Sequence, residues 1–240
     1  MKNLLRLTSV ITVGLFVLWS GSLNAKPTDE SQRIQDSLGV LHDLTGSPDH
    51  SIPRHLLERS EAIVVIPSLV KGGFVVGAKH GRGVMSARVG GKGFSEPAFV
   101  TMSGGSVGWQ IGLESVDLVL LVMNRKGVDD LLSDNFTMGG NASVAAGPVG
   151  RGADAATDAK LSSQILAYSR AAGLFAGATF EGAALHGDKD ANKAFYGEPM
   201  TVKAITEMTK VPAPEIATTW QQTLNELAVP KAPGRSVAVR

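Results

Sequence analysis

Glycine is concentrated in one part of this chain. Residues 72–112 contain twelve glycines in 41 positions, out of 28 in all 240 residues. Glycine weakens a strand because its backbone loses more entropy on folding, yet the same segment holds runs of strand length such as "GVMSARV" and "PAFVTM". This combination is typical of strong bending, β-bulges and close approach between backbones. We therefore predict an α+β fold in which flanking N- and C-terminal helices surround a strongly coiled, Gly-rich antiparallel β-sheet or barrel-like core.

The strand segments follow two patterns. Residues 107–114 and 174–181 alternate with period two, which is typical of half-buried strands. "VDLVLLVM" is a continuous apolar run and predicts a central strand, and "AIVVIP" is a β-branched run. We expect "GRG" and "GGKG" to break the glycine-rich region into hairpins by forming turns.

Helices are predicted at both ends of the fold. Residues 29–45 place Ile34, Leu38 and Leu41 at helical spacing, with Thr28 or Asp29 as N-cap. The apolar stripe of this helix either packs on the core or lies on a membrane. Residues 51–60 predict a short second helix with Ser51 as N-cap and Pro53 in its first turn. Further short helices are expected at "RKGVDDLLSD", "DANKAFYG", "TVKAITEM" and "TTWQQTLNELA".

The first 25 residues have the pattern of a secretory signal peptide. Lys2 and Arg6 precede an apolar run from Leu7 to Trp19, and small residues end the segment at Ala25. We expect residues 1–25 to be removed, residues 26–228 to form one domain and residues 229–240 to form a flexible C-terminal tail, with the mature protein periplasmic or secreted. The chain has no cysteine, so it is not a lipoprotein and holds no disulfide.

The sequence assembles no catalytic site. The five histidines are scattered without metal-ligand spacing, no Gly-Lys-Ser/Thr loop occurs, and "TMSGGS" lacks the first glycine of a nucleophile elbow. Gly150, Gly152 and Ala155 match a dinucleotide fingerprint in spacing only, because no buried strand leads into them. We expect no enzyme activity, no cofactor, no metal and no small-molecule substrate.

The charge distribution has one unusual region. Without residues 1–25 the chain has 21 basic and 22 acidic side chains, which excludes a generally basic nucleic-acid-binding protein. No acidic residue lies between Glu61 and Glu96, however, and that span holds His80 together with Lys71, Lys79, Arg82, Arg88 and Lys92. Cations beside glycine turns suit an anionic head group such as phosphate. Alternatively, they are strand-edge charges that keep hairpin edges soluble.

A cation near an anionic membrane contributes roughly 1 kcal/mol. Four or five acting together therefore hold a protein on such a surface, whereas one or two do not.

Three long segments carry a family resemblance: "VVIPSLVKGGFVVGAKHGRGVM", "PAFVTMSGGSVGWQIGLESVDLVLLVMNRKGVDDLL" and "ASVAAGPVGRGADAATDAKLSSQILAYSRAAGLFAGATFEGAAL". They resemble the SYLF lipid-binding domain family. The likeness covers about residues 31–197. It implies binding of phosphoinositides and other anionic lipids, no catalytic residue and, as in bacterial members, a secreted protein that stands alone. It also implies that the small-residue stretch 143–158 is packed structure, with Arg151 reaching outward.

The resemblance adds candidate binding residues to the basic region. Lys71 falls in the family element "VKGGF", Arg125 and Lys126 in "NRKG", Arg151 in "AGPVGR", and Tyr168 and Arg170 in "YSR". The expected function is non-catalytic binding of anionic phospholipid or phosphoinositide-like head groups at a membrane surface through the basic Gly-rich region, with the N-terminal amphipathic helix as a further contributor. The alternative is a structural or protein-interaction domain of the cell envelope, with an envelope protein as partner and no lipid binding.

Overall fold

The computed structural model describes residues 28–44, 51–91, 93–133, 136–150, 163–171, 174–178, 180, 182–208 and 211–229, with the backbone alone for 73–76 and 106–113. The expected signal peptide and the tail beyond Val229 lie outside the described residues, so secretion stays a prediction. None of the described helices is long and apolar enough to cross a membrane.

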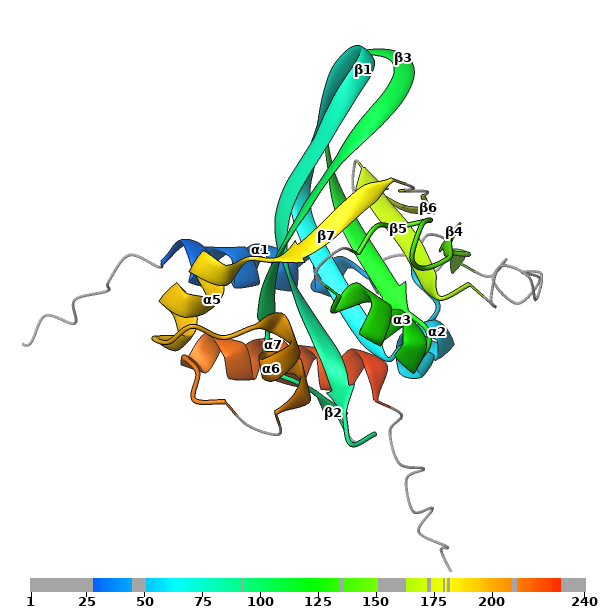
Figure 1. Ribbon diagram of the computed structural model, residues 1–240. Helices are drawn as coiled ribbons and strands as arrows, with labels where there is room; N and C mark the ends of the chain where they lie inside the picture. The colour runs from blue at the N-terminus through cyan, green and yellow to red at the C-terminus, as the bar shows by residue number, and fades with distance from the viewer. Residues whose placement is uncertain are drawn as a thin grey trace, which may run out of the picture.

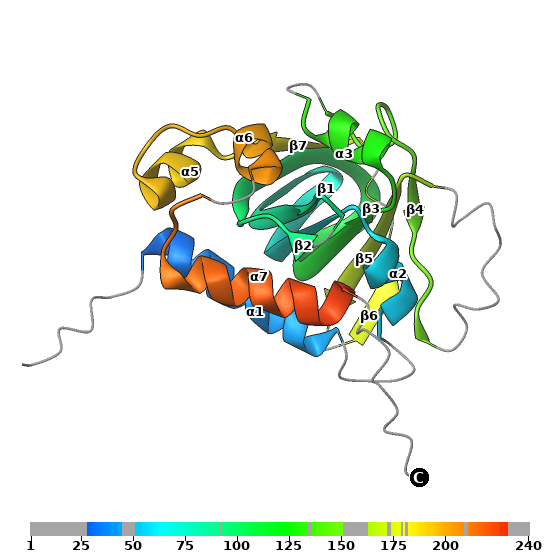
Figure 2. The same cartoon turned by 90° about the horizontal axis from the view of Figure 1, so that it is seen from below.

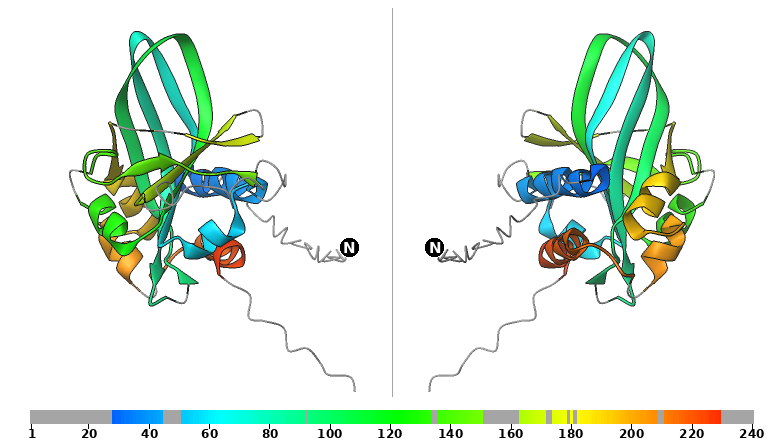
Figure 3. Two further views of the ribbon diagram at one scale, coloured as in Figure 1. Left: turned by 90° about the vertical axis from the view of Figure 1, so that its right-hand side faces the viewer. Right: turned by 90° about the vertical axis from the view of Figure 1, so that its left-hand side faces the viewer.

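Two very long strands form the centre of the molecule. Strand β1 (Ala62–Val89) pairs antiparallel with β3 (Ala98–Val122) along almost their whole length, from Ala62 opposite Val122 to Met85 opposite Ala98. The register shifts between Ile66 and Leu69 and again between Gly73 and Val75, and such irregularities increase local twist and bend. The two-stranded ribbon rises from the body, curves over and returns (Figures 1 and 3).

The glycines of "GRG" make this return possible. A Cβ on Gly81 would lie 2.6 Å from Cγ2 of Ile66, and a Cβ on Gly83 would overlap the backbone carbonyl of Val65. The returning half of β1 therefore packs directly on its outgoing half. The prediction that "GRG" forms a turn is wrong, because the glycines there serve close packing inside a continuous strand. The turn lies at "GGKG", where Gly90 and Gly91 have φ of 58° and 70°.

Shorter strands extend the ribbon into a seven-stranded sheet in the order β2-β1-β3-β5-β4, with β6 paired to β5 and β7 to β3. Their bounds are Gly93–Phe94 for β2, Val144–Ala146 for β4, Ile165–Ala171 for β5, Leu174–Gly177 for β6 and Ala183–Gly187 for β7. All pairs are antiparallel except β4 with β5. The predicted α+β fold with a coiled sheet is confirmed, and "VDLVLLVM" is central as expected.

Helices cover both faces of the sheet, which explains why residues 118–123 of "VDLVLLVM" are apolar at every position. On one face, Ile63 and Val65 pack with α1 (Asp29–Asp43), α2 (Arg54–Arg59), α5 (Lys189–Tyr196) and α7 (Glu215–Ala228). On the other face, Val64 and Ile66 pack with α3 (Arg125–Leu131) and α6 (Val202–Glu207). Figure 2 shows α1 and α7 together on the first face and α3 and α6 across the sheet.

The predicted helices are present, but α7 begins at Glu215, three residues before the expected "TTWQQTLNELA", and α2 begins later than expected. Thr28 caps α1 as expected, since its hydroxyl accepts a hydrogen bond from the Ser31 amide at 3.2 Å. Helix α2 starts two residues later than the expected Ser51 cap implies, because Pro53 occupies the N-cap position and makes no side-chain cap. A proline there fixes the backbone before the helix without supplying a side-chain acceptor.

The apolar stripe of α1 packs on the core. Ile34 and Leu41 are fully buried, and Val40 is 2% exposed. Arg33 adds an ion pair to Asp188, at the start of α5, at 2.9 Å. Of the two expectations for this helix, the structure therefore favours packing on the sheet, and in this arrangement its apolar side chains are not available to a membrane.

Candidate anion-binding site

The nine basic residues predicted to bind head groups do not form one patch. Lys92 and Arg151 lie outside the described residues. The other seven separate into five environments, because β1 is a continuous strand rather than a set of hairpins. Lys71 and Arg82 in particular lie within β1 and not at turns, contrary to expectation.

Arg88 is directed into the protein. Its Nε donates to the carbonyl of Ser60 at 2.6 Å, and its Nη2 donates to the carbonyls of Glu58 and Ala228, both at 2.7 Å. These carbonyls end α2 and α7, where a helix leaves acceptors unsatisfied and carries partial negative charge. The guanidinium also lies 4.7 Å from the ring centre of Phe94. These contacts show a structural role, and they leave little of Arg88 for a ligand.

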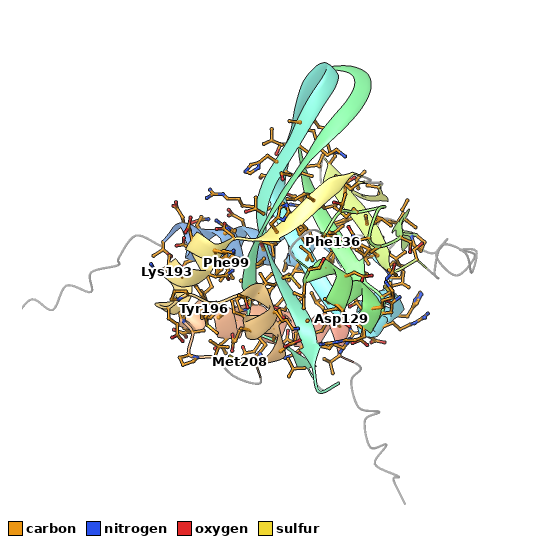
Figure 4. The ribbon with its side chains drawn as sticks, viewed as in Figure 1. Phe99, Asp129, Phe136, Lys193, Tyr196 and Met208 are labelled. Carbon is orange, nitrogen blue, oxygen red and sulfur yellow. The ribbon has the colours of Figure 1, made fainter. Side chains whose placement is uncertain are left out.

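Two cations of α3 face acids on their own helix. Arg125 lies 3.5 Å from Asp129, and Lys126 lies 2.5 Å from Asp130. Hydrogen bonds from Lys126 and Gln164 hold the pKa of Asp130 below its usual range. Figure 4 shows Asp129 on the outside of α3. These are exposed i,i+4 pairs, so each contributes little to stability but partly neutralises its cation.

Arg170 is held by two carboxylates. Its guanidinium binds Asp117 on β3, with Nη2 at 2.5 Å, and also Asp43 at the end of α1. Arg170 therefore ties β5 to β3 and α1. Tyr168, its neighbour in "YSR", belongs to the core: it is fully buried, and its ring fills the space where Gly147 lacks a side chain. The described part of the small-residue stretch is thus packed structure, as the resemblance implies.

Arg82 and His80 face α1. They line a hollow of about 350 Å³ that also includes Asp29, Arg33 and Asp36. The hollow therefore mixes both signs of charge, and Arg82 is among the cations that lower the pKa of Asp188. An added anion would meet carboxylates here, which makes this face a poor anion site.

Among the seven described candidate residues, Lys71 and Lys79 form the pair of cations that the fold brings together without an ion-pairing acid. The bend of β1 places both ammonium groups near the Phe180 ring, with Nζ at 4.9 Å and 5.5 Å from its centre. Within the described parts of the chain, no carboxylate lies within 4.0 Å of either ammonium, although Glu114 is opposite Lys71 in the β-ladder. Burial, together with the charge of Lys71, lowers the pKa of Lys79.

The geometry of this pair suits an anion. Two half-buried ammonium groups repel one another, and an anion between them would relieve that repulsion and accept hydrogen bonds from both. Phe180, which is 1% exposed, supplies a rigid aromatic face beneath them. We define Lys71, Lys79 and Phe180 as the lysine pair site. No group of three His, Asp or Glu able to hold a metal occurs among the described residues.

Comparison with known proteins identifies the family. Residues 103–227, which is more than half of the chain, match the Ysc84 family, described as Las17-binding protein actin regulator. The chain belongs to the Ysc84 family. The expected membership of the SYLF family is thereby confirmed, since this is the same domain.

Similar proteins include yeast and vertebrate members. Protein YSC84 of Saccharomyces cerevisiae is 37% identical over 160 residues, covering 65% of this chain and 34% of that protein. LAS seventeen-binding protein 3 of the same species is 35% identical over 171 residues, covering 70% and 37%. SH3 domain-containing YSC84-like protein 1 of Xenopus laevis is 32% identical over 181 residues, covering 73% and 54%. The chain thus spans about a third to a half of the length of these relatives.

Sequence analysis missed Phe180 as part of the site. Phe180 lies about a hundred residues beyond the two lysines, and no local pattern links it to them. It reaches them because β7 pairs with β3 next to the ribbon, so the segment just before β7 is carried to the returning half of β1.

Proposed function

We propose that this Ysc84-family domain binds the phosphate of an anionic lipid head group at the lysine pair site, without catalysis. The observation that carries the proposal is the approach of Lys71 and Lys79 to one ring without an ion-pairing acid among the described residues. The site lies on the ribbon that stands away from the body (Figure 1), and a projecting element reaches a flat surface more easily than a recessed one.

The number of cations determines what kind of binding to expect. Diffuse attraction of two cations to an anionic surface yields only about 2 kcal/mol, which does not hold a protein on a membrane. Hydrogen bonds from two ammonium groups to one phosphate are stronger, at about 1.5–3 kcal/mol each. The proposal is therefore a discrete head-group site, and it predicts preference for a doubly charged phosphomonoester over a phosphodiester head group.

Vesicle flotation tests this function. Protein is floated with vesicles of phosphatidylcholine alone, with added phosphatidylglycerol, or with added phosphatidic acid, at low and high salt. We expect binding chiefly to phosphatidic acid, weakened by salt and abolished in the double variant Lys71→Gln/Lys79→Gln. The matched control is Arg125→Gln/Lys126→Gln, which changes the net charge equally but on α3.

Equal binding by the two double variants would overturn the lysine pair site. Absence of binding by folded wild-type protein to every vesicle would overturn lipid binding altogether. That second result favours a protein partner, which is the second candidate because the matching family and one relative are named for binding Las17 or LAS seventeen. Cosedimentation with actin filaments and a binding assay against Las17 then test that candidate directly.

A further inference from the structure

A second possible binding place lies on the same side of the sheet as α3 and α6. It is a cavity of about 530 Å³ between β7, the ends of β1 and β3, and helices α3, α5 and α6. Figure 4 helps to locate its walls, since α3 carries the labelled Asp129 and α5 carries the labelled Tyr196. Small-molecule sites in proteins have volumes of about 300–1,000 Å³. The lysine pair site is separate, because neither Lys71 nor Lys79 lines the cavity.

The floor of the cavity is apolar. Met85 and Val100 contribute from the central ribbon, Leu185 from β7 and Leu131 from α3, and each is at most 5% exposed. Leu132, Met200 and Val202 add partly buried apolar walls. Asn192, the buried polar residue in this lining, already exchanges two hydrogen bonds with the backbone of Phe99. The floor therefore offers contact area to hydrocarbon and few free polar groups.

The rim of the cavity is basic. The exposed lining residues include Lys189, Lys203 and His186, and no carboxylate is found in the described lining. Neither lysine forms an ion pair within 4.0 Å with another described residue. A ligand with an apolar body and an anionic end would match both parts of the cavity, because its hydrocarbon would displace water from the floor while its charge meets the lysines.

We infer that this cavity binds a single-chain anionic amphiphile such as a fatty acid or an alkyl phosphate. A water molecule takes up about 30 Å³ in the liquid, and a methylene group is similar in size, so the cavity has room for on the order of fifteen such groups. One chain of medium length fits this volume, whereas the two long chains of a phospholipid do not. The inference does not depend on head-group binding at the lysine pair site, since the two sites share no residue.

Titration calorimetry with dodecanoate below its micelle concentration tests the inference. Dodecyl phosphate is the second anionic probe, and dodecanol and dodecyltrimethylammonium are the neutral and cationic probes. We expect both anions to bind and both other probes to bind at least about tenfold more weakly. The relative affinity of the two anions shows whether carboxylate or phosphate is the better end group.

Two variants locate the site. Lys189→Gln/Lys203→Gln should weaken dodecanoate binding by roughly tenfold, whereas the control Lys126→Gln/Lys193→Gln, with the same charge change outside the lining, should bind as wild type. Leu132→Trp fills the cavity with the lysines intact and should abolish binding. If Leu132→Trp does not fold, as judged by its melting curve, the lysine variant alone decides. The inference is overturned if wild type does not bind dodecanoate or if it binds dodecanol equally well. It is also overturned if Lys189→Gln/Lys203→Gln and the control Lys126→Gln/Lys193→Gln lose dodecanoate binding equally.

Discussion

Arg88 allows a sharp test, because sequence and structure assign it different roles. The structure gives its guanidinium three bonds of 2.6–2.7 Å to the carbonyls of Ser60, Glu58 and Ala228. Hydrogen bonds to a charged group contribute about 1.5–3 kcal/mol each. Water can partly replace Arg88 at these helix ends, because the side chain is only half-buried. We therefore expect Arg88→Met, which keeps the apolar stem, to lower the free energy of unfolding by about 3 kcal/mol.

The loss can be measured by urea unfolding followed by tryptophan fluorescence. Trp220 is a suitable reporter because it is fully buried and its Nε1 donates to the Ser86 hydroxyl at 2.8 Å. The midpoint should fall without change in slope, and the melting temperature should drop by about 6–12 °C.

The control Arg125→Met removes only exposed ion pairs and should change stability by less than about 0.5 kcal/mol. Vesicle binding of Arg88→Met should equal that of wild type under conditions where both are folded. A loss below about 1 kcal/mol together with weaker vesicle binding would refute a structural role for Arg88.

Three further changes test the packing and the charges of the fold. Gly83→Val places a side chain against the Val65 carbonyl and should cost more than about 3 kcal/mol, seen as a lower urea midpoint or loss of cooperative unfolding. Tyr168→Phe should raise stability by about 1 kcal/mol, measured in the same way, because the buried hydroxyl has no hydrogen-bond partner among the described residues. Burial acts to raise the pKa of Asp188, but the hydrogen bonds it accepts, chiefly from Arg33, outweigh this and lower it. The stability that Asp188 contributes is therefore present at neutral pH and lost as pH falls through its folded pKa. In urea unfolding, Asp188→Asn should have a lower free energy of unfolding than wild type at pH 7, and the difference should shrink below about pH 4.

Local sequence patterns predicted where strands and helices occur, but not that several strand segments join into one long strand. The alternation of residues 107–114 and the apolar run of β3 identify strands because side-chain period and burial are local properties. The "GRG" segment was misassigned because glycine serves turns and close packing alike. Only the contact of Gly83 with Val65, eighteen positions away, shows which role applies. A long strand that folds back on itself is therefore hard to recognise from sequence alone.

The candidate site shows the same limit. The span without acids between Glu61 and Glu96 contains Lys71 and Lys79, which have no ion-pairing carboxylate among the described residues. The linear charge distribution did not reveal which of the cations would lack an acid, because the groups that contact each cation come from distant elements. Helices α2 and α7 provide the carbonyls around Arg88, and the segment before β7 provides Phe180. The charge count along a chain shows how many cations a segment contains, whereas the fold determines which of them are free to bind an anion.

This distinction determines how binding must be tested. A variant that replaces Lys79, Arg82, Arg88 and Lys92 together, as the linear sequence suggests, also removes the cation that holds the ends of α2 and α7. Such a protein lacks Lys79 and is also destabilised by the loss of Arg88, so a loss of vesicle binding would not separate a head-group site from an effect on the fold. Changing Lys71 and Lys79 alone avoids this problem, because neither makes an ion pair or hydrogen bond within the described residues that the fold would lose. A loss of binding in that variant, with an unchanged melting temperature, would therefore reflect the site itself.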